Sequence, residues 1–352
     1  MSPLRVVHVV RRYGPVGGME RYVWETTRAM SKSGVAVSVL CEALHAPAPD
    51  GIEVVQLGEI APRPRWLSLM RFSRRAGRWL RATQTPGRIV HSHERLGVHD
   101  VTTFHGPPFA TIFERGWWRR ASVRVAAQLW LERRELCAAQ VRAVVPNSAL
   151  IREQLARYYP RIGARMAAPI PPGVNPGPAR GARAVPEDGG VIGFVGKEWK
   201  RKGLDIALAA AALLRRKRPG LKLLIVGPEA EEIGSLLSQA DVPATCAGWA
   251  DSAPYYPQMH VLLHPARAEP YGMVIAEAMA ARVPVVVSDR CGIAPEVERV
   301  AAGTVLPLDA RPQAWAAACD AALSRPEPPL AYTRSWSQVA QEYLALYGTL
   351  SR

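Results

Sequence analysis

Apolar runs of strand length alternate with helical segments along most of this 352-residue chain. Arg5–Val10 is a continuous apolar run of the kind that forms a strand buried on both faces. A helix is predicted from about Met19 to Lys32, because Gly34 follows as a stop signal, and Val35–Cys41 is the next strand. Strand, glycine-containing loop, helix and strand in this order predict a βαβ unit with parallel strands.

The same alternation continues through both halves of the chain. Further strands are predicted at Arg88–Ser92, Asp100–Phe104, Arg142–Val145, Val191–Gly196, Leu221–Val226, Ala244–Ala247, Val261–His264 and Val283–Ser288. Further helices are predicted at Arg63–Arg81, at Gln128–Cys137, from the cap Asn147-Ser148 to Tyr159, and at Leu204–Lys217, Glu229–Gln239 and Trp336–Leu350. Proline and glycine crowd residues 169–190, which marks a linker. The sequence therefore predicts an α/β protein with one domain over residues 1–170, a linker over 171–190, a second domain over 191–335, and a final segment over 336–352.

A turn and the helix after it carry the most distinctive chemistry. In the turn Glu269-Pro270-Tyr271-Gly272, the proline stiffens the backbone and the glycine allows a ligand to come close. The helix Met273–Ala281 is apolar on every side except at Glu277, so we expect it to be buried, and a buried carboxylate needs a hydrogen-bonding partner. Ligand hydroxyls could supply that partner, although an isolated helical glutamate more commonly faces solvent. Unpaired N–H groups at the start of this helix favour phosphate, so the stretch indicates a sugar-nucleotide site.

The net charge of +15 is concentrated in the first half. Residues 1–175 hold 26 Lys and Arg against 12 Asp and Glu, whereas residues 176–352 hold 19 against 18. Nucleic acid, an anionic membrane surface or a phosphorylated acceptor could each account for this excess. The five cysteines are dispersed, which is typical of reduced thiols in the cytoplasm. No secretory segment is recognisable, and the longest apolar run, Ile206–Leu214, is too short to cross a membrane.

Much of this positive charge lies on the predicted helix Arg63–Arg81. Its arginines at 71, 74, 75 and 78 are spaced so that they share one helical stripe, while two tryptophans and several large apolar residues occupy other positions. A basic helix with tryptophans suits the headgroup region of an anionic membrane, but the same pattern fits a helix that packs its apolar side on the core. A second aromatic and basic cluster, Arg115–Arg120, favours the membrane or a lipid-linked acceptor.

Two loops are candidates for phosphate binding. Gly17 and Gly18 precede a predicted helix and could direct backbone N–H groups at a phosphate. Their spacing is not that of the dinucleotide fingerprint and no suitable acid follows the second strand, which argues against a nicotinamide enzyme. Lys197 and Lys202 flank a strand-to-helix turn, where their compact charges suit a diphosphate or form part of a solvated loop.

Three histidines follow predicted parallel strands. His91 and His93 lie at the end of one strand and His105 follows another, so all three should face the edge at which ligands of α/β proteins bind. The His91-x-His93 pair could hold a metal, but clustered carboxylate or cysteine partners are missing. The sequence therefore favours core or ligand-facing histidines and no metal.

These motifs resemble the signature of the retaining GT-B glycosyltransferases in the glycosyltransferase 4 group. The shared features are Glu-Pro-aromatic-Gly with a second Glu eight positions on, the line Phe194–Lys197 followed by Lys202-Gly203, and the N-terminal Gly-Gly-x-Glu-Arg at residues 17–21. The resemblance covers nearly the whole chain and implies two Rossmann-like parallel-sheet domains facing a central cleft. It also implies that the helix over residues 336–352 crosses back to the first domain.

The resemblance further implies roles for individual residues. Glu269 would contact the hydroxyls of the transferred sugar and Glu277 the ribose of the nucleotide. Oxygens of the sugar and diphosphate would be received by the backbone amides at Gly272, Met273 and Val274. Lys197 and Lys202 would stabilise the departing diphosphate without a metal or other cofactor, and His105 would contact the sugar from the first domain.

Three positions depart from the family pattern. Lys197 stands where arginine is usual, which loses bidentate geometry towards the diphosphate. Arg282 stands where glycine is common after the helix, and a positive φ there would strain it by about 1 kcal/mol. Cys291-Gly292 replaces a glycine pair.

The expected activity is transfer of a hexose-like sugar from a nucleoside diphosphate sugar, such as a UDP-sugar, with retention of configuration. The expected acceptor is a glycolipid or oligosaccharide, and the segments 91–95 and 197–203 resemble enzymes of the bacterial lipopolysaccharide core. Such an enzyme would work in the cytoplasm, on the inner membrane surface. The alternatives are a sugar-nucleotide epimerase of the same fold, a glycoside hydrolase with paired carboxylates, and a non-catalytic nucleic-acid binder.

Overall fold

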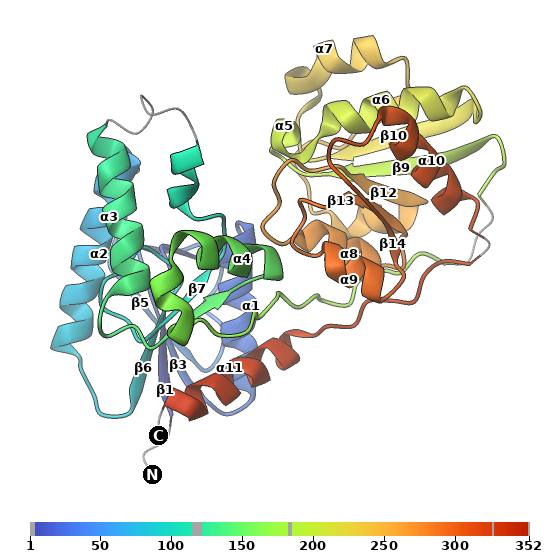
Figure 1. The fold of residues 1–352 in the computed structure, drawn as a ribbon. Coiled ribbons are helices and arrows are strands. Elements are labelled where there is room, and N and C mark those ends of the chain that lie inside the picture. The colour runs from blue at the N-terminus through green and yellow to red at the C-terminus, as the bar shows by residue number, and fades with distance from the viewer. Residues whose placement is uncertain (1–3, 115–121, 182–184, 326, 351–352) are drawn as a thin grey trace. The chain divides into compact units, whose positions relative to one another are not determined.

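The chain consists of two compact units, one interrupted by the other. A computed structural model describes residues 4–114, 122–181, 185–325 and 327–350. The first unit contains Met1–Gly173 together with Ser335–Arg352, and the second is the continuous segment Val174–Arg334 (Figure 1). Each unit is built around a six-stranded sheet in which every pair of neighbouring strands is parallel.

The first sheet has the strand order β5-β3-β1-β6-β7-β8. Its strands are β1 (Arg5–Val9), β3 (Ala36–Cys41), β5 (Ile52–Gln56), β6 (Arg88–Ser92), β7 (Val101–Phe104) and β8 (Ala143–Pro146). The short strands β2 (Arg12–Tyr13) and β4 (Ala43–Leu44) form a separate parallel pair. Because β1 and β6 are central, every residue after the first of each strand is buried, as the apolar run Arg5–Val10 predicts for β1.

Helices cover both faces of this sheet. They are α1 (Gly18–Lys32), α2 (Arg65–Ala82), α3 (Val123–Cys137), α4 (Ala149–Tyr158) and α11 (Trp336–Leu350), with 3₁₀ turns at Phe109–Glu114 and Pro160–Arg165. The α4 helix begins where predicted, because the Ser148 hydroxyl accepts a hydrogen bond from the Ile151 N–H at 3.3 Å. The last helix, α11, packs along α1 within the first unit (Figure 1).

The basic helix α2 packs its apolar side into the protein. Phe72, Ala76 and Leu80 are buried against β1, β3 and β6, so the apolar pattern is explained by the core. The four arginines at 71, 74, 75 and 78 are all exposed, as their shared stripe predicts. The second basic cluster, Arg115–Arg120, lies outside the described residues.

The second sheet has the order β11-β10-β9-β12-β13-β14. Its strands are β9 (Gly189–Val195), β10 (Gly220–Val226), β11 (Ala244–Cys246), β12 (Val261–His264), β13 (Val285–Ser288) and β14 (Gly303–Leu306). The order reverses between β9 and β12, and a ligand of an open parallel sheet binds beside such a switch point, at the carboxyl ends of the strands.

Two separate apolar cores lie on the two faces of the second sheet. One contains α8 (Met273–Ala280) and α9 (Ala294–Arg299), and the other contains α6 (Leu204–Arg215), α7 (Ala230–Ala240) and α10 (Pro312–Leu323). The one-turn helix α5 (Trp199–Lys202) and the 3₁₀ turn Ala253–Gln258 lie in the connections. Among the described residues, no helix is both long and apolar enough to cross a bilayer.

Candidate functional site

Glu269 is fixed by its own backbone at the edge of the second sheet. It lies in the loop between β12 and α8, and its N–H donates to the Arg290 carbonyl at 3.0 Å. Its carbonyl accepts from the Gly292 N–H at 2.9 Å, so residues 269 and 291 form an isolated parallel bridge. The Cys291-Gly292 turn after β13 therefore sets the position of this carboxylate.

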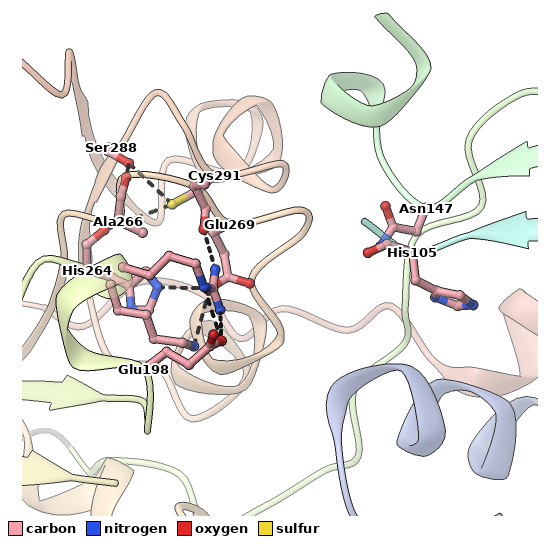
Figure 2. Close-up of polar contacts among 11 residues, drawn as sticks. His105, Asn147, Glu198, His264, Ala266, Glu269, Ser288 and Cys291 are labelled. Atoms are coloured by element: carbon pink, nitrogen blue, oxygen red, sulfur yellow. Dashed lines mark hydrogen bonds and ion pairs between the residues drawn. The ribbon is translucent and has the colours of Figure 1, made fainter. Parts of the chain in front are cut away.

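Cations and one imidazole surround the Glu269 carboxylate, whose side chain is only 12% exposed (Figure 2). Its Oε2 lies 3.2 Å from Lys202 Nζ, 3.5 Å from an Arg201 guanidinium nitrogen and 3.5 Å from His264 Nε2. Burial alone would raise the pKa of this carboxyl, but Lys202, His264 and Arg201 outweigh burial and hold the pKa well below its usual range. Glu269 is therefore ionised and can only accept hydrogen bonds at neutral pH.

The side chain of Lys202 lies directly over a glycine, Gly196, on its way to Glu269. It is the last residue of α5, and its side chain passes over Gly196 at the end of β9, where an added Cβ would lie 2.1 Å from Lys202 Cδ. The following Gly203 has φ 78°, and a Cβ there would meet the Pro265 carbonyl oxygen at 2.2 Å. Both glycines are thus required to bring Lys202 to the carboxylate.

Lys197 lies apart from this carboxylate cluster. Its side chain is exposed, and its Nζ lies 5.2 Å from the centre of the Trp249 ring in a cation–π contact. Trp249 is itself 66% exposed, and its backbone N–H donates to the Glu229 carboxylate at 3.1 Å. The two lysines expected to act together therefore have different surroundings: Lys202 pairs with an acid, and Lys197 covers an exposed aromatic face.

The start of α8 requires a glycine. Gly272 has φ 111°, and a Cβ there would lie 2.8 Å from Ile275 Cδ1. Its carbonyl accepts from the N–H groups of Ile275 and Ala276, which begins the helix and leaves the N–H groups of Met273 and Val274 ahead of the first helical bond. This end of the helix carries a partial positive charge and directs N–H groups outward, as the expected diphosphate contact requires.

Glu277 is half-buried, whereas the sequence predicts a helix buried on all sides. Its Oε2 accepts from the Tyr256 hydroxyl at 2.7 Å and from the Ser252 hydroxyl at 3.3 Å. Tyr256 lies in the 3₁₀ turn Ala253–Gln258, which packs beside α8, and Ser252 directly precedes this turn, so the polar side of the helix faces it.

In the first unit, Gly17 caps α1 and Gly18 opens it. The Glu20 carboxylate folds back so closely that a Cβ on Gly17 would lie 2.4 Å from its Oε2, while nothing lies within 4 Å of one on Gly18. Arg12 Nε donates to Glu20 at 2.9 Å and offsets its charge. Gly17 therefore makes room for an ion pair, and Gly18 leaves an open approach to the helix start.

His105 is the outermost of three hydrogen-bonded histidines, His8, His93 and His105, and lies at the carboxyl edge of the first sheet. Its side chain is half-buried, and its Nε2 lies 2.9 Å from His93 Nδ1. The Asn147 side chain donates to its backbone carbonyl at 3.2 Å (Figure 2). Burial lowers the pKa of His105 to about 3, so the ring is neutral at physiological pH.

His91 lies in a second chain of hydrogen bonds. Its Nδ1 contacts the Tyr347 hydroxyl at 2.6 Å and its Nε2 contacts the Thr103 hydroxyl at 2.8 Å. These hydrogen bonds continue from the Thr103 hydroxyl to the Tyr343 hydroxyl (2.6 Å) and from there to the Tyr22 hydroxyl (2.8 Å). The Tyr22 hydroxyl donates to the Ile170 carbonyl. Because a carbonyl only accepts, each hydroxyl donates towards it, and His91 carries its proton on Nε2.

The three rings His8, His91 and His93 could in principle hold a metal, because their ring nitrogens lie within 4.8 Å of one another. Both nitrogens of His91 and of His93, and Nδ1 of His8, are already used in hydrogen bonds. The group contains no carboxylate or thiolate to balance a divalent charge. The geometry therefore fits neutral hydrogen-bonded histidines better than metal ligands.

Sequence reasoning missed several neighbours of the site. His264 is the last residue of β12, so the rule that singled out His91 and His105 applies to it equally. Arg201 lies inside the motif 197–203 but was not singled out. Trp249 and Ser252 lie in a loop and Tyr256 lies in a short 3₁₀ turn, where the sequence has no periodic pattern to indicate them.

Comparison with known families assigns a domain to each half of the chain. Residues 16–177 match the model described as Glycosyltransferase Family 4, and residues 189–325 match the one described as Glycosyl transferases group 1.

Similar curated proteins include the D-inositol 3-phosphate glycosyltransferases of Segniliparus rotundus and Geodermatophilus obscurus. The first is 27% identical and the second 28% identical, and in both cases the alignment covers 95% of this chain and 85% of the relative.

Solved structures with the same fold include WaaG, a glycosyltransferase involved in lipopolysaccharide biosynthesis, with a TM-score of 0.79 and 19% identity over 98% of each chain. Sucrose-phosphate synthase from Thermosynechococcus elongatus has a TM-score of 0.77 and 20% identity over 99% of each chain. Anabaena Alr3699/HepE, solved in complex with UDP and glucose, has a TM-score of 0.67 and 16% identity over 98% of this chain and 100% of the other. With both sheets, both family matches and these neighbours in agreement, the chain belongs to the GT-B glycosyltransferases of the family 4 and group 1 type.

Proposed function

We propose that the protein transfers a hexose-like sugar from a nucleoside diphosphate sugar to an anionic glycolipid or oligosaccharide, with retention of anomeric configuration. The observation that carries the proposal is the Glu269–Lys202 pair beside the start of α8. It combines an ionised carboxylate for sugar hydroxyls with an ammonium and helix N–H groups for a diphosphate.

The reaction breaks the bond between the anomeric carbon and the diphosphate oxygen and forms a bond from that carbon to an acceptor hydroxyl oxygen. The proton of the acceptor hydroxyl passes to the departing diphosphate oxygen, which serves as base on the same face of the sugar. Lys202 and the amides of Met273 and Val274 stabilise the negative charge that builds on the leaving group. Glu269 cannot donate a proton, because its pKa is held low, so its role is to orient the sugar hydroxyls.

The nucleoside is held by groups at two places on the second unit. Glu277 accepts hydrogen bonds from hydroxyl groups, as its contacts with Tyr256 and Ser252 illustrate. A ribose offers two adjacent hydroxyls that can donate to the same carboxylate. The exposed ring of Trp249, with Lys197 against it, offers a face on which a base can stack. The chain's own cations balance the diphosphate, so the proposed reaction needs no metal and turnover should persist in excess EDTA. The UDP complex of HepE makes a UDP-sugar the first donor to test.

The acceptor is proposed to be anionic because the first unit carries the charge excess. Residues 1–175 account for nearly all of the net charge of +15. Two anionic acceptors are compared: a lipopolysaccharide core, which is of the proposed class and is suggested by the likeness to WaaG, and an inositol phosphate, which is outside that class and is suggested by the names of the curated relatives. Assays with each acceptor and one radiolabelled donor distinguish the two classes, since only the true acceptor yields a labelled product.

We also propose that the exposed arginines of α2 hold the protein on the anionic cytoplasmic surface of the inner membrane. Each basic residue near such a surface contributes about 1 kcal/mol. Replacing Arg71, Arg74 and Arg78 by Glu should abolish sedimentation with phosphatidylglycerol vesicles at low salt. Replacing three other exposed arginines of the same unit, at 124, 152 and 161, makes the same charge change elsewhere and should leave most of the binding. Equal losses in both triple variants would show that net charge alone acts.

Thermal stabilisation by UDP- and GDP-sugars tests the donor, and turnover tests the chemistry. We expect Glu269→Gln and Lys202→Met each to lower kcat by about 10²–10³ with the fold intact. Glu231→Gln, an exposed change on α7, is the matched control and should keep full activity. Full activity in either site variant would refute the mechanism. Release of free sugar at the same rate without acceptor would indicate a hydrolase, and conversion of the donor to an epimer would indicate an epimerase.

A further inference from the structure

Three histidines on neighbouring strands of the first sheet form one continuous line of hydrogen bonds. His8 on β1 contacts His93, which follows β6, through Nδ1 and Nε2 at 3.0 Å. His93 contacts His105, which follows β7, through Nδ1 and Nε2 at 2.9 Å. His8 and His93 are buried, with 0% and 4% of their surface exposed, and His105 is half-buried. The line therefore runs from the interior of the sheet to its carboxyl edge.

All three rings are neutral. Burial lowers the pKa of His8 and of His105 to about 3 and lowers the pKa of His93 well below its usual value. A neutral imidazole carries one proton, so each ring donates through one nitrogen and accepts through the other. Since His93 is bonded through both nitrogens, the line has two possible directions, and the tautomers of all three rings are coupled.

The inner end of the line distinguishes the two directions. His8 Nε2 is buried and has no hydrogen-bond partner in the part of the chain that the structure describes. If His105 donates inward, this nitrogen must carry a buried N–H with no acceptor. If His8 donates outward, it carries only a lone pair. Buried N–H groups without a partner are rarer than acceptors without one, so the outward direction is favoured.

We propose that His8 and His93 are positioning residues that hold His105 as the tautomer with its proton on Nδ1. His8 donates to His93, and His93 donates to Nε2 of His105. Within the described residues, Nδ1 of His105 has no hydrogen-bond partner and is not among the buried polar atoms that lack one. His105 therefore presents an N–H donor, and not a lone pair, at the edge of the sheet.

This assignment deepens the proposed function and, in its consequence for catalysis, rests on it. A donor suits an oxygen of the sugar or of the diphosphate, whereas removing the proton from an acceptor hydroxyl would require a lone pair. His105 thus binds a ligand oxygen and does not act as a general base. His8 and His93 contribute only through the tautomer they impose.

The tautomer can be read directly in the full-length, ligand-free protein labelled with ¹⁵N-histidine. Long-range ¹H–¹⁵N correlation spectra at neutral pH should show a protonated Nδ1 and an unprotonated Nε2 for His105. His99 is the internal control, because its Nε2 lies 3.0 Å from the Glu135 carbonyl oxygen and must carry the proton there. Protonation of His105 at Nε2 would overturn the proposal, as would zinc-dependent shifts at His8 and His93. This readout does not need a donor sugar, so it stands even if the proposed transferase reaction fails.

A matched pair of variants tests the link to function. Asparagine at position 93 keeps an N–H near the place of Nδ1, whereas leucine has a similar shape and no polar atom. We expect His93→Asn to retain the His105 tautomer and a KM for the donor within about twofold of the wild type. His93→Leu should give mixed tautomers at His105 and a KM raised by about threefold to tenfold, the usual range for one lost hydrogen bond. Equal effects of the two variants on both the spectrum and KM would refute the positioning role.

Discussion

Removing one buried histidine should make the first unit more tolerant of acid. His99 lies just before β7 with 2% of its surface exposed, and its Nε2 donates to the Glu135 carbonyl at 3.0 Å. Burial, reinforced by the charge of Arg134, lowers its pKa from 6.5 to about 4. In His99→Gln the glutamine amide nitrogen can take the place of Nε2, so the variant loses the titrating group and keeps the hydrogen bond.

The sign and size follow from proton uptake. As the pH falls from 7, the unfolded chain binds a proton at His99 near pH 6.5, but the folded protein binds it only near pH 4. Protonation therefore favours the unfolded state throughout that window, and stability falls as the pH falls. At pH 5, which lies about 1.5 units below the pKa of this histidine in the unfolded chain, the free energy of unfolding is lowered by about 2 kcal/mol. The wild type should lose about 2 kcal/mol more than His99→Gln between pH 7 and pH 5.

The measurement must report on the first unit alone, because the two units need not unfold together. Urea unfolding at pH 7 and pH 5, followed by hydrogen exchange of peptides from β6 and β7, satisfies this condition. Exposed His45→Gln is the control and should behave as the wild type. The reasoning is refuted if His99→Gln loses as much stability as the wild type, or if His99 titrates near pH 6.5 in the native protein.

Three further substitutions test the packing arguments by urea unfolding. Gly203→Ala places a Cβ 2.2 Å from the Pro265 carbonyl oxygen in a residue with φ 78°, so the free energy of unfolding of the second unit should fall by about 1–3 kcal/mol or more. An unchanged free energy of unfolding would contradict the described turn. Arg282 has φ 60°, so Arg282→Gly should stabilise the second unit by up to about 1 kcal/mol, whereas Arg282→Ala should give no gain. Fully buried Glu132 pairs with Arg95 at 2.8 Å, so Glu132→Leu should cost the first unit about 3–5 kcal/mol, and a neutral result would show that the pair is dispensable.

The regular elements of the central sheets were predictable because they are apolar and bounded by turn residues. The predicted strands Arg88–Ser92 and Val261–His264 and the helix Trp336–Leu350 match the observed elements residue for residue. Two of the four edge strands, β5 and β14, were missed for the converse reason: they are only partly buried and carry no continuous apolar run. No helix is predicted from the sequence at the one-turn helix α5, since its four polar or aromatic residues show no helical period.

For the candidate site, the contacts between residues depend on the folded chain and are not encoded by local sequence patterns. Arg282 has φ 60°, so the condition under which the sequence predicts strain at this position is met. The contact between Lys202 and Glu269 joins residues 67 positions apart, and no local pattern encodes it. The separation of Lys197 from that pair likewise depends on where Trp249 lies after folding. The line of histidines also required the strand order, which places β1 beside β6 and β6 beside β7.

Because α11 belongs to the first unit but follows the whole of the second, the order of synthesis and the order of folding must differ. A chain emerging from the ribosome displays β1 to β8 long before Tyr343 and Tyr347 are available to complete the hydroxyl chain around His91. The second unit is continuous and can finish first. Meanwhile, the surface of α1 that α11 will cover stays open to chaperones, which predicts that nascent chains stalled before residue 335 are retained by them.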